Sequence, residues 1–284
     1  MIITTKKKVQ LAALAARVIV AFRRLSGNGS LVRARRGGFW WELDLSEGID
    51  FSIYLLGAFE RSTAAALRKL LRPGDVAMDI GANVGAHTLG MANSVGDAGR
   101  VFAFEPTDFA FSKLQRNLSL NPQLQGHTRI TQTFLGAGHG QSVPAGVYAK
   151  WPLFNREGIH PKHRGQMATT LRAKHSSLDE FVSREGISRI DLIKIDVDGN
   201  ELPVLQGALN SLQRHKPTLV MEMSPYIHAE QNQNFAELVQ LLAELGYSFT
   251  DIDSGRPVPH VPAELKQLIP DGAGINVIAR VVGS

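Results

Sequence analysis

The stretch Val76-Ala-Met-Asp-Ile-Gly-Ala-Asn-Val-Gly-Ala-His-Thr88 decides the fold. Apolar residues lead up to Asp79, two glycines follow at Gly81 and Gly85, and apolar residues recur from Leu89 with the spacing of a buried helix face. A strand that passes through a glycine turn into a helix is typical of nucleotide-binding α/β domains, because glycine permits a sharp turn and a close approach to backbone N–H groups. The stretch predicts such a turn here.

The spacing of the glycines indicates which ligand the turn holds. A dinucleotide fingerprint, G-x-G-x-x-G, seats a pyrophosphate, whereas this turn has the pattern D-x-G-x-x-x-G with Asp79 just before it. A carboxylate there would repel a pyrophosphate and suit a cation, such as the amino group of S-adenosylmethionine. A second expected strand ends at Glu105, whose carboxylate would accept hydrogen bonds from ribose hydroxyls. In the weaker alternative, the glycines make an ordinary turn and Glu105 is a solvated strand end.

From this turn onward, apolar runs with strand and helix periods alternate. Strands are expected at 76–79, 100–105, 128–135, 190–196, 218–223, 247–252 and 275–281, and helices at 62–71, 108–120, 198–213 and 234–245. Short strands are expected within 39–56, and Ser177 is expected to cap a helix. The alternation predicts a mostly parallel sheet with helices on both faces and with ligands at the carboxyl ends of the strands.

Composition favours one large domain. The chain has 284 residues, of which 44% are hydrophobic and 20% charged, enough for one α/β core but short for two domains. The sequence contains no cysteine, which excludes disulfides, thiolate catalysis and cysteine-ligated metal. A cytoplasmic location is the default expectation, with peripheral membrane attachment as a possibility.

The N-terminal arm, residues 1–38, differs from the rest. It carries nine basic residues and no acid: Lys6, Lys7, Lys8, Arg17, Arg23, Arg24, Arg33, Arg35 and Arg36. Apolar residues fall on one side of an expected helix that is too short and too interrupted to span a bilayer: Leu11, Leu14, Ala15, Val18 and Phe22. Glycine-rich breaks at 27–30 and 35–38 place the start of the folded domain, 39–284, near Phe39.

The arm admits several uses. A signal peptide is disfavoured because Arg17 interrupts the apolar run and two arginines follow where a cleavage site should lie. A transit peptide fits the composition but requires a eukaryotic source. A helix packed on the domain is the favoured use, followed by docking on a membrane surface. The basic charge alone does not indicate a nucleic-acid partner.

A second group of charged residues follows the strand expected at 190–196. Lys194, Asp196, Asp198 and Glu201 occur within eight residues, and such charges are costly to bury unless they are used or solvated. Glu222 ends the next expected strand.

Together these runs resemble a known family. The segments 79–85, 104–106, 117–121, 177–179, 190–201 and 205–207, followed by Glu222, are similar in order to the signature of the FkbM family of S-adenosylmethionine-dependent methyltransferases. The resemblance covers roughly residues 50–252. It implies a class I, Rossmann-like fold and methylation of hydroxyl groups on sugars or natural products such as macrolides. Asp198 stands where the family usually has glutamate.

The resemblance and the strand ends together give the candidate site. The cofactor-binding candidates are Asp79, Gly81, Asn83, Gly85, Glu105 and Pro106. His87 would contact the methionine part of the cofactor or cap the following helix, with capping slightly favoured.

The catalytic candidates are Asp196, Lys194 and Glu222. Asp196 is the first choice for general base or substrate orienter, because an alcohol is a poor nucleophile near neutral pH. Lys194 lies on the same strand face and would hold the substrate oxygen or pair with Asp196, and a purely structural ion pair is the alternative. Asp196, Asp198 and Glu222 could bind a divalent metal, by analogy with other O-methyltransferases, and metal dependence stays open.

The expected function is O-methylation of a carbohydrate or glycosylated acceptor, supplied as a small molecule or a lipid-linked sugar. The segment 136–176 matches no family motif and is expected to shape the acceptor site. Its lone Trp151 could stack on a sugar, and six basic residues would suit a phosphate or carboxylate: Lys150, Arg156, Lys162, Arg164, Arg172 and Lys174. Alternatives are an RNA or protein methyltransferase guided by the basic arm, and a nucleoside-binding protein without catalysis.

Overall fold

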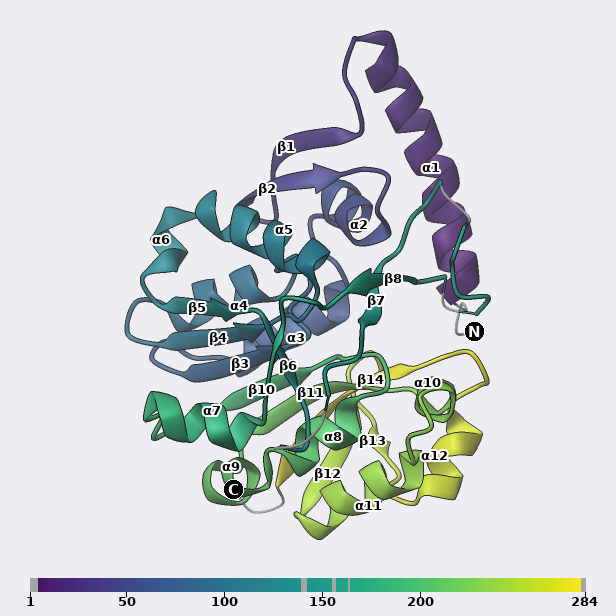
Figure 1. The fold of residues 1–284 in the computed structure, drawn as a ribbon. Helices are drawn as coiled ribbons and strands as arrows, with labels where there is room; N and C mark the ends of the chain where they lie inside the picture. The colour runs from purple at the N-terminus through teal and green to yellow at the C-terminus, as the bar shows by residue number, and fades with distance from the viewer. Residues whose placement is uncertain (1–4, 139–141, 155–156, 163, 282–284) are drawn as a thin grey trace.

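The computed structural model describes residues 5–138, 142–154, 157–162 and 164–281 (Figure 1). Its centre is an eight-stranded sheet. In sheet order the strands are β13 (Pro257–Val258), β12 (Tyr247–Asp251), β14 (Ile275–Val281), β11 (Thr218–Met223), β10 (Leu192–Ile195), β3 (Val76–Ile80), β4 (Arg100–Phe104) and β5 (Thr128–Thr131). The five strands β5, β4, β3, β10 and β11 run parallel to one another. Strand β14 pairs antiparallel with both β11 and β12. The order β5-β4-β3-β10-β11 is the Rossmann order and confirms the predicted fold class.

Helices cover both faces of this sheet (Figure 1). They are α3 (Arg61–Leu70), α4 (Thr88–Val95), α5 (Asp108–Ser119), α6 (Pro122–Gln125), α7 (Leu178–Glu185), α8 (Glu201–Gln206), α9 (Leu209–His215), α10 (Pro225–Glu230), α11 (Phe235–Glu244) and α12 (Pro262–Leu268). Neighbouring residues of β3 belong to different cores: Met78 packs in the cluster with α7 and α11, and Ala77 in the cluster with α3 and α4. The strand is apolar on both faces because both faces are covered.

The N-terminal residues pack against this core. Helix α1 (Thr5–Leu25) contacts α2 (Gly48–Leu56), and β1 (Leu31–Arg36) pairs antiparallel with β2 (Phe39–Asp44). The predicted domain boundary therefore falls in the turn of this hairpin. Among the described residues, no helix combines the length and apolar character needed to cross a membrane.

The strands expected within 39–56 are correct for β2 and wrong for 48–56, which form α2. The buried residues of α2 include Ile49, Asp50 and Ile53, which share one side of a helix. Buried Asp50 accepts a hydrogen bond from the N–H of Asp44 and pairs with Lys113 of α5. This tertiary pairing, with Gly57 as a left-handed C-cap, outweighs the alternating pattern.

Two other expected elements are divided. The strand at 128–135 separates into β5, in the main sheet, and β6 (Thr133–Leu135), which pairs with β9 (Lys174–Ser176). The helix at 198–213 breaks between α8 and α9 at Gly207, where a Cβ would lie 2.0 Å from the carbonyl oxygen of Gly136. Ser177 caps α7 in a capping box with Glu180, as predicted.

Candidate active site

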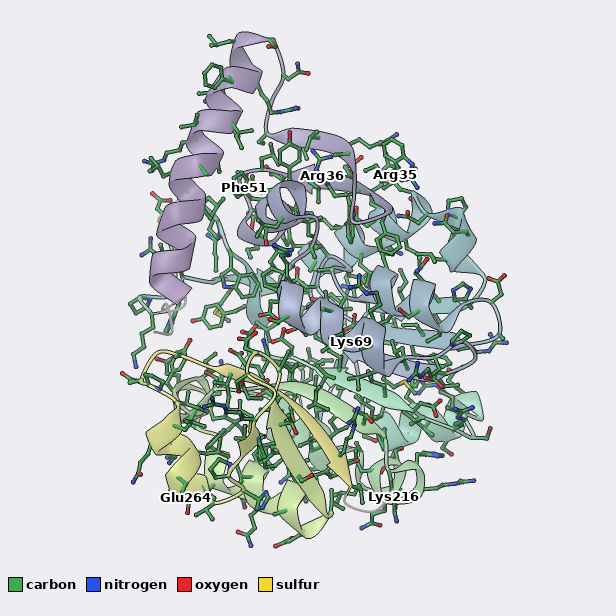
Figure 2. All side chains as sticks on the ribbon, turned by 180° about the vertical axis from the view of Figure 1, so that it is seen from behind. Arg35, Arg36, Phe51, Lys69, Lys216 and Glu264 are labelled. Carbon is green, nitrogen blue, oxygen red and sulfur yellow. The ribbon has the colours of Figure 1, made fainter. Side chains whose placement is uncertain are left out.

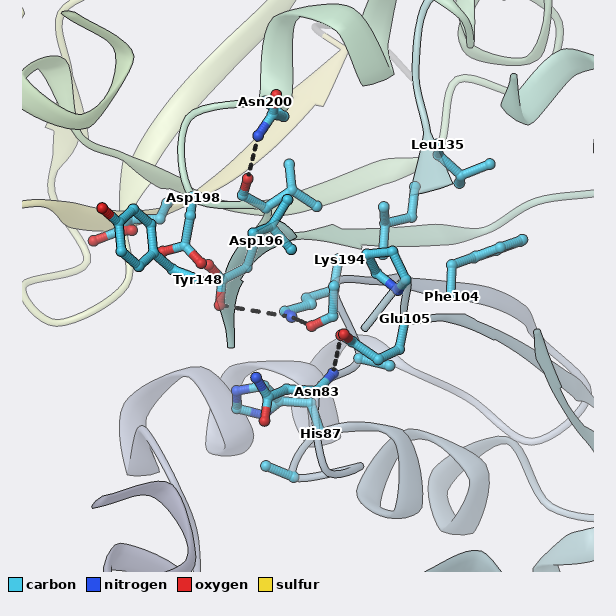
Figure 3. A pocket seen from close by; sticks show the side chains of 18 of the residues that line it. Asn83, His87, Phe104, Glu105, Leu135, Tyr148, Lys194, Asp196, Asp198 and Asn200 are labelled. Atoms are coloured by element: carbon cyan, nitrogen blue, oxygen red, sulfur yellow. Dashed lines mark hydrogen bonds and ion pairs between the residues drawn. The ribbon is translucent and has the colours of Figure 1, made fainter. Parts of the chain in front are cut away.

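A cavity lies at the carboxyl ends of β3, β4, β10 and β11 (Figure 3). All of the candidates for cofactor binding, catalysis and metal binding line it except Asp79 and Gly85. The hairpin of β7 (Gly146–Lys150) and β8 (Gln166–Thr169) contributes Val147 and Tyr148, and Trp151 follows directly after β7. The described part of segment 136–176 therefore helps to form the cavity wall, and its role toward an acceptor stays a prediction.

The glycine turn is fixed by its neighbours. Gly81 and Ala82 both donate their N–H groups to the carbonyl oxygen of Phe104, at 3.0 and 2.9 Å. Gly81 has a φ of 79°, and a Cβ there would lie 1.8 Å from the carbonyl oxygen of Asp196. The end of β10 thus requires glycine at this position, independently of any ligand.

Asp79 lies behind the cavity. Its side chain is fully buried, and Oδ2 accepts a 2.6 Å hydrogen bond from the hydroxyl of Thr88. Oδ1 lies 3.3 Å from Nζ of Lys194. The cation beside Asp79 is therefore a lysine of the protein itself, which corrects the expectation of direct contact with a ligand amino group.

Lys194 ties the turn to the sheet. Its Nζ donates to the carbonyl oxygen of Gly81 at 2.8 Å and lies 3.7 Å from Oδ2 of Asp196. Burial lowers the pKa of Lys194, but attraction to Asp79, Asp196 and Glu60 outweighs it and raises the pKa to about 12. The raised pKa keeps Lys194 protonated near neutral pH. Its ion pairs with Asp79 and Asp196 agree with the structural ion-pair alternative, and its role toward a substrate stays a prediction.

Glu105 is held at the cavity edge. Its Oε1 accepts hydrogen bonds from the N–H and hydroxyl of Thr107, at 2.9 and 2.6 Å, and Oε2 accepts from the N–H of Asn83 at 3.0 Å. Burial raises its pKa, although these hydrogen bonds act in the opposite direction. Asn83 also donates its side-chain amide to the carbonyl oxygen of Ala149, which links the turn to β7. Pro106 follows at the cavity wall.

A group of carboxylates occupies the other end of the cavity. Burial raises the pKa of Asp196, and raises those of Asp198 and Glu222 well above the ordinary range, with repulsion from neighbouring carboxylates adding to the effect. Figure 3 shows Asp198 beside Tyr148, on the opposite side of Lys194 from Glu105. Gly274 leaves room for Glu222, since a Cβ there would lie 2.1 Å from Oε1 of that carboxylate.

A buried ion pair fixes the loop after β10. Oε1 of Glu201 accepts from the N–H groups of Val197 and Gly199 at 3.1 and 3.4 Å, and Oε2 lies 3.1 Å from Nε2 of His228. Nδ1 of His228 lies 3.0 Å from the carbonyl oxygen of Ser224. Glu201 belongs to the charged group that follows the strand in the sequence, whereas no sequence pattern marks His228, which lies in α10.

His87 also lines the cavity and is 5% exposed. Within the described residues, neither ring nitrogen has a hydrogen-bond partner, and Nε2 lies 3.9 Å from a carboxylate oxygen of Glu60. Burial, and then the charge of Lys194, lower the pKa of His87 to about 4 despite the opposing effect of Asp79. His87 occupies the N-cap position of α4, as the favoured capping role requires, but its side chain makes no capping hydrogen bond.

The predicted metal ligands Asp196, Asp198 and Glu222 share the cavity. In the described parts of the chain, however, no group of three or more histidine or carboxylate side chains is arranged to hold a metal ion. The metal expectation therefore gains no support from the structure.

Comparison with known proteins identifies the family. The model of the methyltransferase FkbM domain matches residues 79–249. The chain belongs to the FkbM family of S-adenosylmethionine-dependent methyltransferases. The match begins at Asp79 and ends in β12, so it contains the glycine turn and the carboxylates after β10.

Two curated relatives share part of this region. The chain is 30% identical to the hexuronic acid methyltransferase AglP of Haloferax volcanii over 139 residues, which are 49% of this chain and 52% of AglP. It is 30% identical to the methyltransferase sdnD of Sordaria araneosa over 157 residues, 46% of this chain and 59% of that protein. The chain thus spans little more than half the length of the curated relatives it matches.

Solved structures resemble the chain weakly. Methyltransferase FkbM from Methylobacillus flagellatus KT has a TM-score of 0.43 and 16% identity, covering 76% of this chain and 50% of that one. An O-methyltransferase from Thermotoga maritima has a TM-score of 0.43 and 13% identity, and the match covers 92% of this chain and 82% of that one. At these TM-scores the resemblance carries no argument, and the fold class rests on the strand order of the sheet.

The cavity residues fit the cofactor that the family implies. Figure 3 shows Phe104 and Leu135 on the same side of the cavity as Glu105, where a flat apolar base and a hydroxyl-bearing ribose would both find partners. The unpartnered ring nitrogens of buried His87 leave hydrogen-bonding capacity facing the same cavity. Asn83 is held between these groups by its bond to Glu105.

Proposed function

We propose that this chain transfers a methyl group from S-adenosylmethionine to a hydroxyl of a carbohydrate or glycosylated acceptor. The observation that carries the proposal is the group of carboxylates Asp196, Asp198 and Glu222, which line the cavity on the β10 and β11 side of the glycine turn, whereas Glu105 lies on the β4 side. When bound, the cofactor supplies an electrophilic methyl group on a sulfonium. The chain itself must position the acceptor and take its proton.

Opposite ends of the cavity suit different ligands. Phe104 and Leu135 are the last residues of β4 and β6, and Glu105 follows β4; all three lie on one side of the glycine turn. On the other side of the turn, Asp196 follows β10 and Glu222 lies at the end of β11. The nucleoside is assigned to the first end, and the acceptor hydroxyl to the second.

The carboxylates suit the role of general base. Lys194 stays protonated near neutral pH because its pKa is about 12, so it orients Asp196 and does not accept a proton. A raised carboxylate pKa lies closer to the working pH, where a base accepts protons most effectively. Asp196 remains our first choice for this base, with Glu222 as the second.

The charge lining the cavity favours an uncharged acceptor group. The wall includes Glu60, Asp196, Asp198 and Glu222, with Lys194 as its lysine. None of the described basic residues of segment 136–176 lines the cavity. Three of them have partners elsewhere: Lys150 lies over the ring of Phe109, Lys162 pairs with Glu230 and Asp271, and Arg172 lies 4.0 Å from Asp108. Arg156 lies outside the described residues. An anionic group on the acceptor would therefore remain at the cavity rim.

The activity named for one relative supports a sugar acceptor. AglP is a hexuronic acid methyltransferase, and it shares 30% identity over about half of each chain. Trp151 lines the cavity in this chain and offers an aromatic face for a sugar ring. Replacing Trp151 with alanine should weaken acceptor binding, and unchanged acceptor affinity would count against this contact.

A methylation assay tests the proposal. The protein is incubated with S-adenosylmethionine and neutral sugars, glycosylated macrolides or uronic acids, and mass spectrometry detects one added methyl group. Neutral hydroxyl acceptors should be methylated, and Asp196→Asn or Glu222→Gln should lower the rate about 100-fold, as loss of a general base does. Asp253→Asn, a change on the surface, is the control. The rate should fall on acidification, starting above the ordinary carboxyl range, because protonation removes the base.

Two results would oppose the proposal. Full activity in both Asp196→Asn and Glu222→Gln would remove these residues from the chemistry. Transfer to RNA or protein, but to no sugar hydroxyl, would favour the alternative class of methyltransferase.

A further inference from the structure

Helix α1 presents an apolar ridge to solvent. The ridge consists of Leu14, Val18, Phe22 and Leu25, which are 65%, 51%, 67% and 84% exposed. Their spacing of four, four and three residues places them along one side of the helix. α1 lies along the margin of the molecule in both views (Figures 1 and 2). Large apolar side chains exposed in a continuous row indicate an interaction surface.

The other side of α1 already packs on the domain. Ala16 and Val20 are 0% and 3% exposed and belong to the same buried cluster as Phe51 and Ile53 of α2. The favoured structural role of the arm thus accounts for this side of the helix. It does not account for the ridge, which points away from the packed residues.

Positive charge flanks the ridge. Arg17 and Arg24 are exposed, and at 100° per residue they lie to one side of Val18 and Phe22. No aspartate or glutamate occurs before Glu42 in the sequence. An apolar strip beside positive charge, with no acid near it in the chain, is complementary to the acyl boundary and phosphates of an anionic bilayer.

We propose that α1 docks on the surface of an anionic lipid bilayer. The ridge enters the region below the headgroups, and Arg17 and Arg24 contact lipid phosphates. α1 packs on α2, whose Ile49 lines the cavity, so docking brings the active site to the lipid surface. There the enzyme would meet a lipid-linked sugar. That consequence rests on the proposed function, whereas the docking itself does not.

Vesicle co-sedimentation of the full chain tests the docking. Vesicles of phosphatidylcholine alone are compared with vesicles that also contain phosphatidylglycerol. The wild type should bind the anionic vesicles, and added salt should weaken binding. The double variants Val18→Ser with Phe22→Ser, and Arg17→Gln with Arg24→Gln, should each bind at least about tenfold more weakly.

Matched controls use exposed residues outside α1. Leu171→Ser with Leu268→Ser removes two apolar side chains that are 83% and 51% exposed, and Arg68→Gln with Lys69→Gln removes two exposed charges of α3. Both controls should bind as the wild type does. All of the variants replace solvent-exposed side chains, and their thermal unfolding should confirm that they fold.

Three outcomes would overturn the proposal. The folded wild type would fail to bind anionic vesicles, or the ridge variant would bind them as tightly as the wild type. Alternatively, light scattering would show a wild-type dimer that the ridge variant converts to a monomer, with no lipid binding by either. The ridge would then be covered by a second copy of the chain.

Discussion

Nζ of Lys194 on β10 lies 3.3 Å from Oδ1 of Asp79, its direct register partner on the neighbouring strand β3. Both side chains are buried, and Lys194 also donates to the carbonyl oxygen of Gly81 in the glycine turn. One ammonium group therefore joins the two central strands to the turn at the cavity. Loss of the ammonium group would leave the carboxylate of Asp79 buried without a countercharge.

Lys194→Met should lower the free energy of unfolding by about 3–5 kcal/mol, the usual cost of breaking a buried pair. Urea unfolding measures the loss. The exposed control Lys69→Met should change stability by no more than about 0.5 kcal/mol. The double variant Lys194→Met with Asp79→Asn should recover part of the lost stability, because it also removes the unpaired carboxylate of Asp79. Strict additivity of the two single effects would contradict the pairing.

Gly81→Ala should destabilise the protein by roughly 3 kcal/mol or prevent folding, because the added Cβ meets a backbone carbonyl and the φ is positive. Gly90→Ala is the matched control. Gly90 lies within α4, and a Cβ added there would have no neighbouring atom within 4 Å. It should stabilise the helix by up to about 1 kcal/mol. Thermal unfolding separates the two variants, and equal effects would rule out the close approach of β10 as the reason for glycine.

His87 should make the protein sensitive to acid. Burial lowers its pKa from 6.5 to about 4, so the unfolded chain binds the proton more readily than the folded one. The resulting contribution to stability is complete above pH 6.5 and is lost as the pH falls toward 4, by roughly 3 kcal/mol in total.

His87→Phe removes this titration, so its stability should fall less steeply across that interval than the wild type's. Urea unfolding at a series of pH values measures the slope. His260→Phe, at an exposed position, should follow the wild type. If His87→Phe also follows the wild type, His87 is not held neutral by burial.

Much of the site could be predicted because its residues follow apolar runs. Val76 to Ile80 and Leu192 to Ile195 are strands buried on both faces, and parallel strands bring their carboxyl ends to one edge. The shared edge of the parallel strands therefore predicted that Glu105, Asp196 and Glu222 lie at one site, although the strand order was not known.

The partners of buried charges could not be predicted in this way. Asp79 pairs with Lys194, which is distant in the sequence, because β3 and β10 are neighbours in the sheet. His228 pairs with Glu201 because α10 packs over the loop after β10, and no local pattern marks it. The same holds for α2, which tertiary contacts of Asp50 keep helical.

Calorimetric titration with S-adenosylmethionine tests the central claim, that the cavity binds the cofactor at its Glu105 end and the acceptor at its Glu222 end. The wild type should bind the cofactor at one site. Glu105→Gln should bind at least about tenfold more weakly, as loss of hydrogen bonds to a carboxylate predicts, whereas Glu222→Gln should bind like the wild type. Absence of binding by the folded wild type, or equal affinity in wild type and Glu105→Gln, would contradict the account.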